Sequence, residues 1–110
     1  MQLDRKKEAR QALAERLTRM TAETLRTMMR GDDIELRRGA TLAAAMKDDK
    51  AHIPDLIDRL SDPHELVLRA AKAGLKSLTG QNFGPADGAS ESQKQAAIVE
   101  WKAWLAKQKK

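Results

Sequence analysis

Apolar residues recur at every third or fourth position along most of this chain, a spacing that places them on one face of an α-helix. Six segments show this pattern, and we expect one helix in each: residues 4–20, 22–30, 34–47, 52–60, 62–80 and 91–107. No stretch alternates apolar and polar residues as a half-buried β-strand does. The pattern therefore predicts an all-α protein of about six helices.

The segment from residue 62 to residue 80 carries the most complete helix signals. Asp62 is placed to cap the N terminus, Pro63 suits the first helical position, and Glu65 completes a capping box. Gly80 is expected to end the helix, because glycine enters the left-handed conformation without steric cost. The apolar face of this helix is rich in alanine and glycine, so a neighbouring helix can approach closely: Leu66, Val67, Ala70, Ala71, Gly74, Leu75 and Leu78.

The chain contains an internal repeat, since a shift of 31 residues aligns residues 20–49 with residues 51–80. Apolar residues then align with apolar ones and small with small: Ala22 with Ile53, Leu25 with Leu56, Met29 with Leu60, Leu36 with Val67, Gly39 with Ala70, Ala40 with Ala71 and Ala43 with Gly74. Each copy consists of a short helix, a tight turn with aspartate and a longer alanine-rich helix. Because neither pair can close a core alone, we expect them to stack and share one interior, with Leu36 and Val67 in similar surroundings.

The longer helices of the two copies carry the motif of a known family. Residues 33–40 (Asp-Ile-Glu-Leu-Arg-Arg-Gly-Ala) and 62–71 (Asp-Pro-His-Glu-Leu-Val-Leu-Arg-Ala-Ala) resemble the first-helix signature of HEAT repeats, and residues 53–60 resemble the second-helix signature. The first copy departs from the pattern because Asp32-Asp33 stands where the family has Asp-Pro. The resemblance implies a short α-solenoid in which HEAT-like, armadillo-like helical hairpins stack with a right-handed sense.

A solenoid needs end helices that hide the faces of its stack, and this requirement suggests how the single domain is divided. The expected parts are N-terminal capping helices (1–31), a HEAT-like core (32–80), a loop (81–89) and a C-terminal capping helix (90–110). The segment Leu-Thr-Gly-Gln-Asn-Phe-Gly at 78–84, followed by Trp101 and Trp104, is similar to an ending of bacterial HEAT-repeat proteins, notably those of planctomycetes. That second resemblance implies no activity.

The amino-acid composition excludes several classes of protein and of site. The chain has 110 residues, no cysteine and three aromatic residues, Phe83, Trp101 and Trp104. The lack of cysteine excludes disulfides and thiolate metal ligation. We expect Trp101 to pack on Gly74, Leu75 and Leu78, with Phe83 beneath the loop. No apolar run reaches the ~20 residues that span a bilayer, and the N terminus has no apolar signal core. We therefore expect a cytoplasmic protein, although a piece of a longer secreted protein would look the same.

Residues for catalysis are sparse. His52 and His64 stand near predicted helix starts without a second ligand at helical spacing, so we interpret them as exposed or capping. The pair Asp48-Asp49 is typical of a turn, and the loop glycines lack the flanking strand and lysine of a phosphate cradle. We expect no enzymatic activity, no metal and no cofactor.

The HEAT resemblance implies binding of another protein, or of other domains of a longer chain. In such stacks the second helices line a concave surface, which here would carry Met28 with Asp55, Asp58 and Arg59. Arg59 is placed to neutralise both aspartates. Trp104 is a further candidate, because tryptophan is enriched at binding hot spots. The candidate partner-binding residues are therefore Met28, Asp55, Arg59 and Trp104.

Charge leaves an alternative open. The formal net charge is +5, and basic residues outnumber acidic ones in residues 1–30 and 81–110 but not in 31–60. Ion-paired helix surfaces explain this distribution, and so would a helical-repeat module that binds nucleic acid through phosphate contacts. Such contacts would come from the basic N-terminal helix: Arg5, Lys6, Lys7, Arg10, Arg16 and Arg19. In either case we expect a monomer or a weak homodimer.

Overall fold

The computed structural model describes residues 2–108, with side chains from residue 8 onward. Regular structure in this range is helical throughout, and the predicted all-α class is confirmed. The elements are α1 (Gln2–Leu17), α2 (Ala22–Met29), α3 (Ile34–Met46), a short 3-10 turn η1 (Lys50–His52), α4 (Ile53–Arg59), α5 (Glu65–Thr79) and α6 (Glu91–Gln108). Each predicted helix is present, with its ends displaced by at most a few residues.

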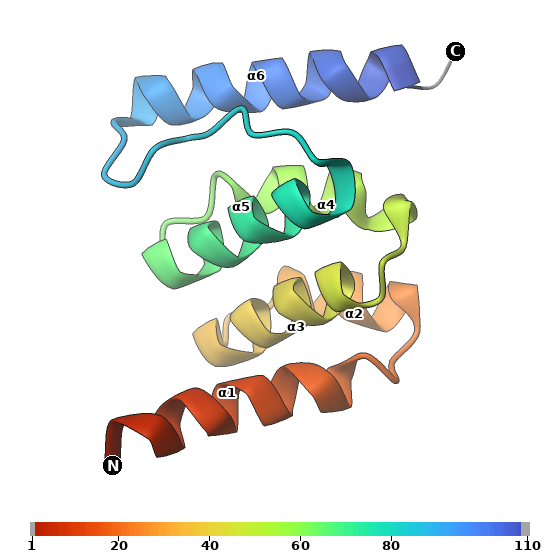
Figure 1. Cartoon of the computed structure of the whole chain (residues 1–110), viewed down its shortest axis with the longest axis vertical. Coiled ribbons are helices and arrows are strands. Elements are labelled where there is room, and N and C mark those ends of the chain that lie inside the picture. The colour runs from red at the N-terminus through yellow and green to blue at the C-terminus, as the bar shows by residue number, and fades with distance from the viewer. Residues whose placement is uncertain (1, 109–110) are drawn as a thin grey trace.

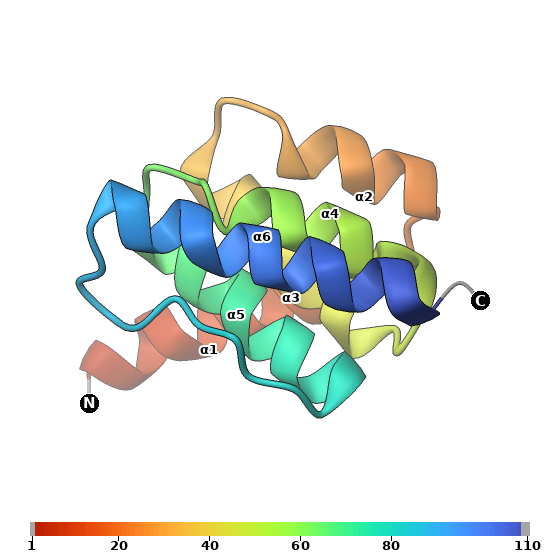
Figure 2. The same ribbon diagram turned by 90° about the horizontal axis from the view of Figure 1, so that it is seen from above.

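The helices form two rows (Figure 1). Helices α1, α3 and α5 are stacked side by side along the long axis of a body that measures 42 × 30 × 25 Å, with their own axes running roughly across it, and the shorter α2 and α4 lie behind them. After a long connection, α6 lies across the end of the stack, over α4 and α5 (Figure 2). Both copies of the repeat therefore pair a short rear helix with a longer front helix.

Most predicted helix ends are present. The side chains of Thr21 and Asp33 accept backbone N–H groups at the starts of α2 and α3, and Ser90 does so at α6. Gly80 ends α5 in the left-handed conformation, with φ of 73°. These local signals act within one turn of helix, which explains why they can be identified without tertiary information.

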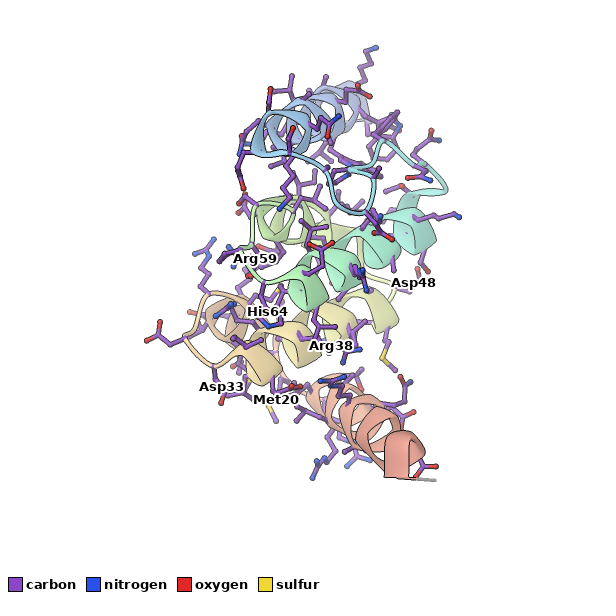
Figure 3. All side chains as sticks on the ribbon, turned by 90° about the vertical axis from the view of Figure 1, so that its left-hand side faces the viewer. Met20, Asp33, Arg38, Asp48, Arg59 and His64 are labelled. Atoms are coloured by element: carbon purple, nitrogen blue, oxygen red, sulfur yellow. The ribbon has the colours of Figure 1, made fainter. Side chains whose placement is uncertain are left out.

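The predicted start of α5 is wrong. His64, not Asp62, is the N-cap, and its Nδ1 accepts the backbone N–H of Leu66 at 3.3 Å. Pro63 consequently precedes the helix. His64 aligns with Asp33, the N-cap of α3, in the 31-residue register. Both caps lie on the side of the molecule that faces the viewer in Figure 3, where α3 and α5 begin.

The repeat is preserved in the core. Three aligned pairs are all 2% exposed or less: Leu25 with Leu56, Met29 with Leu60 and Ala40 with Ala71. Helices α3 and α5 approach closely, because a Cβ added to Gly74 would lie 2.9 Å from the Cβ of Ala45. The expected small-residue contact between long helices is therefore present.

One expectation about the repeat is wrong, since Leu36 and Val67 lie in different surroundings. Val67 is fully buried, whereas Leu36 remains 37% exposed. Both helices lie between others, α3 between α1 and α5, and α5 between α3 and α6 (Figure 1). Leu36 is in the first turn of α3, directly after Glu35. Arg10 of α1 is bonded to the neighbouring Glu35 at 3.3 Å, so charge rather than an apolar side chain stands beside this turn.

The aromatic residues seat α6 on the stack. Trp101 is fully buried, its ring meets Phe83 edge-on at 4.8 Å between centroids, and its Nε1 donates to the Gly84 carbonyl at 2.9 Å. Trp101 shares the core cluster with Leu75 and Leu78 as expected. Gly74 does not belong to this contact, because it faces α3 and α4.

The connection between α5 and α6 is tied back to α5. The Lys72 ammonium donates to the Pro85 carbonyl and to Asp87 Oδ1, both at 3.0 Å. This hydrogen bond, the charge of Lys72 and that of Arg69 lower the pKa of Asp87 from its ordinary value. The loop thus has a fixed path that sets where α6 crosses the stack.

Candidate binding groove

The predicted concave surface between α2 and α4 is closed by polar contacts. Arg26 Nε donates to Asp55 Oδ2 at 2.9 Å, and His52 Nδ1 lies 3.2 Å from the same oxygen. The remaining seam beside these contacts has no room for a water molecule. Asp55 is therefore bound within the chain and is not presented to a partner.

His52 stands at the N-cap position of α4, as one of its two predicted roles required, but it is fully buried and its side chain makes no capping hydrogen bond. Because the Asp55 carboxylate is an acceptor, the hydrogen of the neutral ring belongs on Nδ1. Nε2 finds no hydrogen-bond partner among the described residues. His52 thus links η1 to α4, and through Asp55 to Arg26 on α2.

Arg59 does not neutralise Asp55 or Asp58, contrary to prediction. Its Nη1 donates to the Met29 carbonyl at 2.9 Å and lies 3.4 Å from Asp62 Oδ2. The side chain is 19% exposed. Figure 3 shows Arg59 close to His64, near the turn that leads into α5.

Asp62 is the centre of this polar network, and its side chain is only 1% exposed. Arg37 of α3 binds the carboxylate with two nitrogens, Nε at 3.0 Å and Nη2 at 3.2 Å. The backbone N–H of His64 donates to it at 2.8 Å. Arg37 also donates to the Gly31 carbonyl at 3.0 Å. The network joins the two turns that precede α3 and α5, which is a structural role.

Met28, another predicted partner-binding residue, is half-buried and packs against the core of the protein. Trp104 differs. Its ring meets Trp101 edge-on at 6.3 Å, yet it is half-exposed and lines an open groove of about 640 Å³. Trp104 therefore lies in a different part of the molecule from Met28, Asp55 and Arg59, and the sequence did not predict that the four residues would form one site.

The groove lies where the ends of α5 and α6 meet the start of α4. Its apolar walls are Ile53, Leu78, Trp104 and Leu105. Its polar walls are Lys50, Thr79, Gln81 and Gln108. A volume of this size falls within the range of ligand-binding clefts, roughly 300–1,000 Å³, and mixed walls of this kind are typical of them.

Two of the polar wall residues are held by the chain itself. Thr79 Oγ1 donates to the Leu75 carbonyl at 2.6 Å and accepts the Gln81 N–H at 3.0 Å. Gln108 Nε2 lies 3.5 Å from the Trp104 carbonyl. By contrast, Lys50 is exposed, and among the described residues it has no ion-pair partner. None of the described acidic side chains lines the groove.

A second hollow, of about 300 Å³, lies between α1 and α3 and is lined by Ala9, Arg10, Leu13 and Glu35. The Arg10–Glu35 ion pair occupies its rim. Burial and the adjacent Arg10 guanidinium lower the pKa of Arg38 on α3, and Glu35 opposes them. Two guanidinium groups thus face a single carboxylate here, that of Glu35.

The basic N-terminal helix is placed only in part. Arg10 is paired with Glu35, whereas Arg16 and Arg19 are exposed. The side chains of Arg5, Lys6 and Lys7 lie outside the described residues.

Among the residues described, no group of three or more acidic or histidine side chains could hold a metal ion. None of the described helices is long and apolar enough to cross a membrane.

Comparison of the chain with protein-family models, with curated proteins and with solved structures found no match.

Sequence reasoning identified one groove residue, Trp104, and missed the rest. Lys50, Ile53, Gln81 and Leu105 come from different helices or turns, and no local motif connects them. The ion pair between Arg37 and Asp62 could have been suspected from the sequence. In the 31-residue register these residues align with Leu68 and Gly31, so each is a charged residue where the other copy has none.

Proposed function

We propose that this chain is a protein-interaction module of the HEAT-repeat type, without catalytic activity, that binds its partner in the groove beside Trp104. The open groove of about 640 Å³ is the observation that carries this proposal, because a partly exposed tryptophan in the wall of a groove can anchor a partner. The HEAT-like motifs and the two rows of paired helices support it.

Location within the fold also favours the groove over the seam between α2 and α4. Arg26, Asp55 and Arg59 in the seam are already paired within the chain, so a partner would have to break those bonds to use them. Apolar surface in the groove is instead partly uncovered, and covering it on binding is favourable by about 25 cal/mol per Å².

The proposal can be tested with random peptides displayed on phage and selected on the immobilised protein. Trp104→Ala removes the anchor and should abolish enrichment, because truncation of a hot-spot tryptophan costs ~2 kcal/mol or more. Gln81→Trp, at an exposed wall position, should block the groove without altering the core. Val99→Ala is the matched control, since Val99 is 65% exposed on the same helix and does not line the groove.

Enrichment that is equal on wild type, Trp104→Ala and Gln81→Trp would place any binding elsewhere and reject the groove. Nucleic-acid binding through the N-terminal helix has less support, because Arg10 is already paired. Binding of DNA or RNA at low salt that falls steeply with added salt, and that Arg16→Ala and Arg19→Ala weaken, would favour that alternative.

A further inference from the structure

We infer that the groove selects an acidic peptide segment, one in which a bulky apolar side chain enters beside Trp104 and a neighbouring carboxylate binds Lys50. This inference rests on the proposed function and specifies the chemistry of the partner. It follows from the distribution of apolar surface and charge around the groove.

The apolar part of the site is built from three separate elements. Ile53 begins α4, Leu78 is in the last turn of α5, and Trp104 and Leu105 lie near the end of α6. Ile53 and Leu78 are almost fully buried, at 3% and 7% exposed, so they form a floor. Trp104 is more exposed and supplies a wall on which an apolar side chain can pack.

The charge of the groove has one sign. Lys50 is its charged wall residue, is exposed, and has no ion-pair partner among the described residues. Asp49, its neighbour in sequence, caps η1 by accepting the Ala51 N–H at 2.9 Å and does not line the groove. A carboxylate on a partner would therefore meet an ammonium group that the chain leaves unneutralised.

The helix ends around the groove do not cancel this charge. The C termini of α5 and α6 each present a partial negative charge of roughly half a unit, but their last turns carry Lys76 and Lys107. After Glu100, α6 contains Lys102 and Lys107 and no acidic residue. Asp48 and Asp49 precede Lys50 in the turn but do not line the groove, so the groove walls and the helix ends around them are neutral to basic, which favours an acidic partner over a basic one.

The walls also favour a peptide over a compact ion. Gln81 lines the groove beside the apolar floor and carries an amide group that can bond to a peptide backbone. A free carboxylate or phosphate would use Lys50 but would leave the apolar surface uncovered. We therefore expect affinity only when charge and apolar side chain belong to the same segment.

The experiment uses a synthetic, acetylated and amidated peptide in which glutamates flank a leucine and a phenylalanine. Two matched peptides replace the glutamates by glutamine or by lysine. Binding is followed by NMR through the indole N–H resonance of Trp104, with the buried Trp101 resonance as internal reference. The acidic peptide should bind ~10-fold more tightly than the glutamine peptide, and the lysine peptide most weakly.

A charge reversal sharpens the test. Lys50→Glu should reverse the preference, so that the lysine peptide binds more tightly than the acidic one. Lys102→Glu is the matched control, because it makes the same change in net charge on an exposed side chain outside the groove, and it should keep the wild-type order. Added salt should reduce the difference between acidic and neutral peptides.

Failure of this inference differs from failure of the proposed function. If the three peptides shift the Trp104 resonance with equal affinity, or if Lys50→Glu leaves their order unchanged, the acidic preference is wrong while the groove remains a binding site. If none shifts Trp104, or if acetate alone competes as well as the acidic peptide, the peptide groove itself is rejected. A Trp104 shift caused by self-association, seen as a rise in mass by ultracentrifugation without peptide, would also overturn the peptide assignment.

Discussion

The two copies of the repeat are alike where they meet and different where they face outward. Leu25 and Ala40 of the first copy are as buried as Leu56 and Ala71 of the second. At the next aligned positions, however, Leu36 is 37% exposed and Val67 is fully buried.

The difference follows from position in the stack. The second copy has the first on one side and α6 on the other, whereas the first copy is covered by α1 (Figure 1). An identical pattern of residues can therefore serve two environments, and a repeat in sequence predicts equal burial only for the faces that both copies share. This distinction can be tested by substitutions at aligned positions.

The largest effect is expected at Asp62, which aligns with Gly31 and has no counterpart in the first copy. Asp62→Ala leaves Arg37 and Arg59 without their carboxylate in a site that is almost closed to solvent, and it should lower the free energy of unfolding by ~3–5 kcal/mol. Urea unfolding followed by circular dichroism measures this change. Asp58→Ala, at an exposed position of α4, should cost under ~0.5 kcal/mol. Equal losses at the two sites would refute the role of the network.

A smaller effect should separate Val67 from Leu36. Val67→Ala removes two buried methyl groups and leaves a cavity between packed helices, so we expect a loss of about 2–3 kcal/mol. Leu36→Ala deletes more atoms but from a partly exposed side chain, and it should cost less than ~1 kcal/mol. The same unfolding measurement compares them. A larger loss at Leu36 would show that α1 covers the first copy more completely than the structure indicates.

The smallest effect compares two glycines on the long helices. A Cβ at Gly74 would lie 2.9 Å from Ala45 Cβ, a contact that only a shift of the helices can relieve. A Cβ at Gly39 would meet side-chain carbons of Leu13 and Leu17 at 3.1–3.3 Å, and these side chains can move. Alanine favours a helix over glycine by about 1 kcal/mol. We therefore expect Gly74→Ala to destabilise by ~1 kcal/mol after overpacking is included, and Gly39→Ala to be neutral or slightly stabilising. A stabilising Gly74→Ala would mean that α3 and α5 are less closely packed than described.

Local chemistry alone determined much of this molecule. The periodicity of Leu, Ala and Met predicted six helices, and Thr21, Asp33, Ser90 and Gly80 marked their ends, because periodicity and capping depend only on residues a few positions apart. The repeat identified several pairs that are buried in both copies, such as Leu25 with Leu56 and Ala40 with Ala71, but not the difference between Leu36 and Val67. Trp101 was correctly assigned to the core, against Leu75 and Leu78, because the rest of the core is poor in aromatic rings.

Tertiary structure decided which charged residues are free. Asp55 and Arg59 have the spacing of a solvated helix face, yet both are bonded within the chain, to Arg26 and to Asp62. Lys50, which follows Asp48 and Asp49 in a turn, is one of the described charged residues for which no ion pair forms within the chain. Whether a charge is neutralised depends on which side chains other helices bring within about 4 Å, and neither residue type nor spacing along one helix contains that distance. For the same reason the groove, whose walls come from η1, α4, α5, α6 and the residue after Gly80, exists only once the helices are stacked.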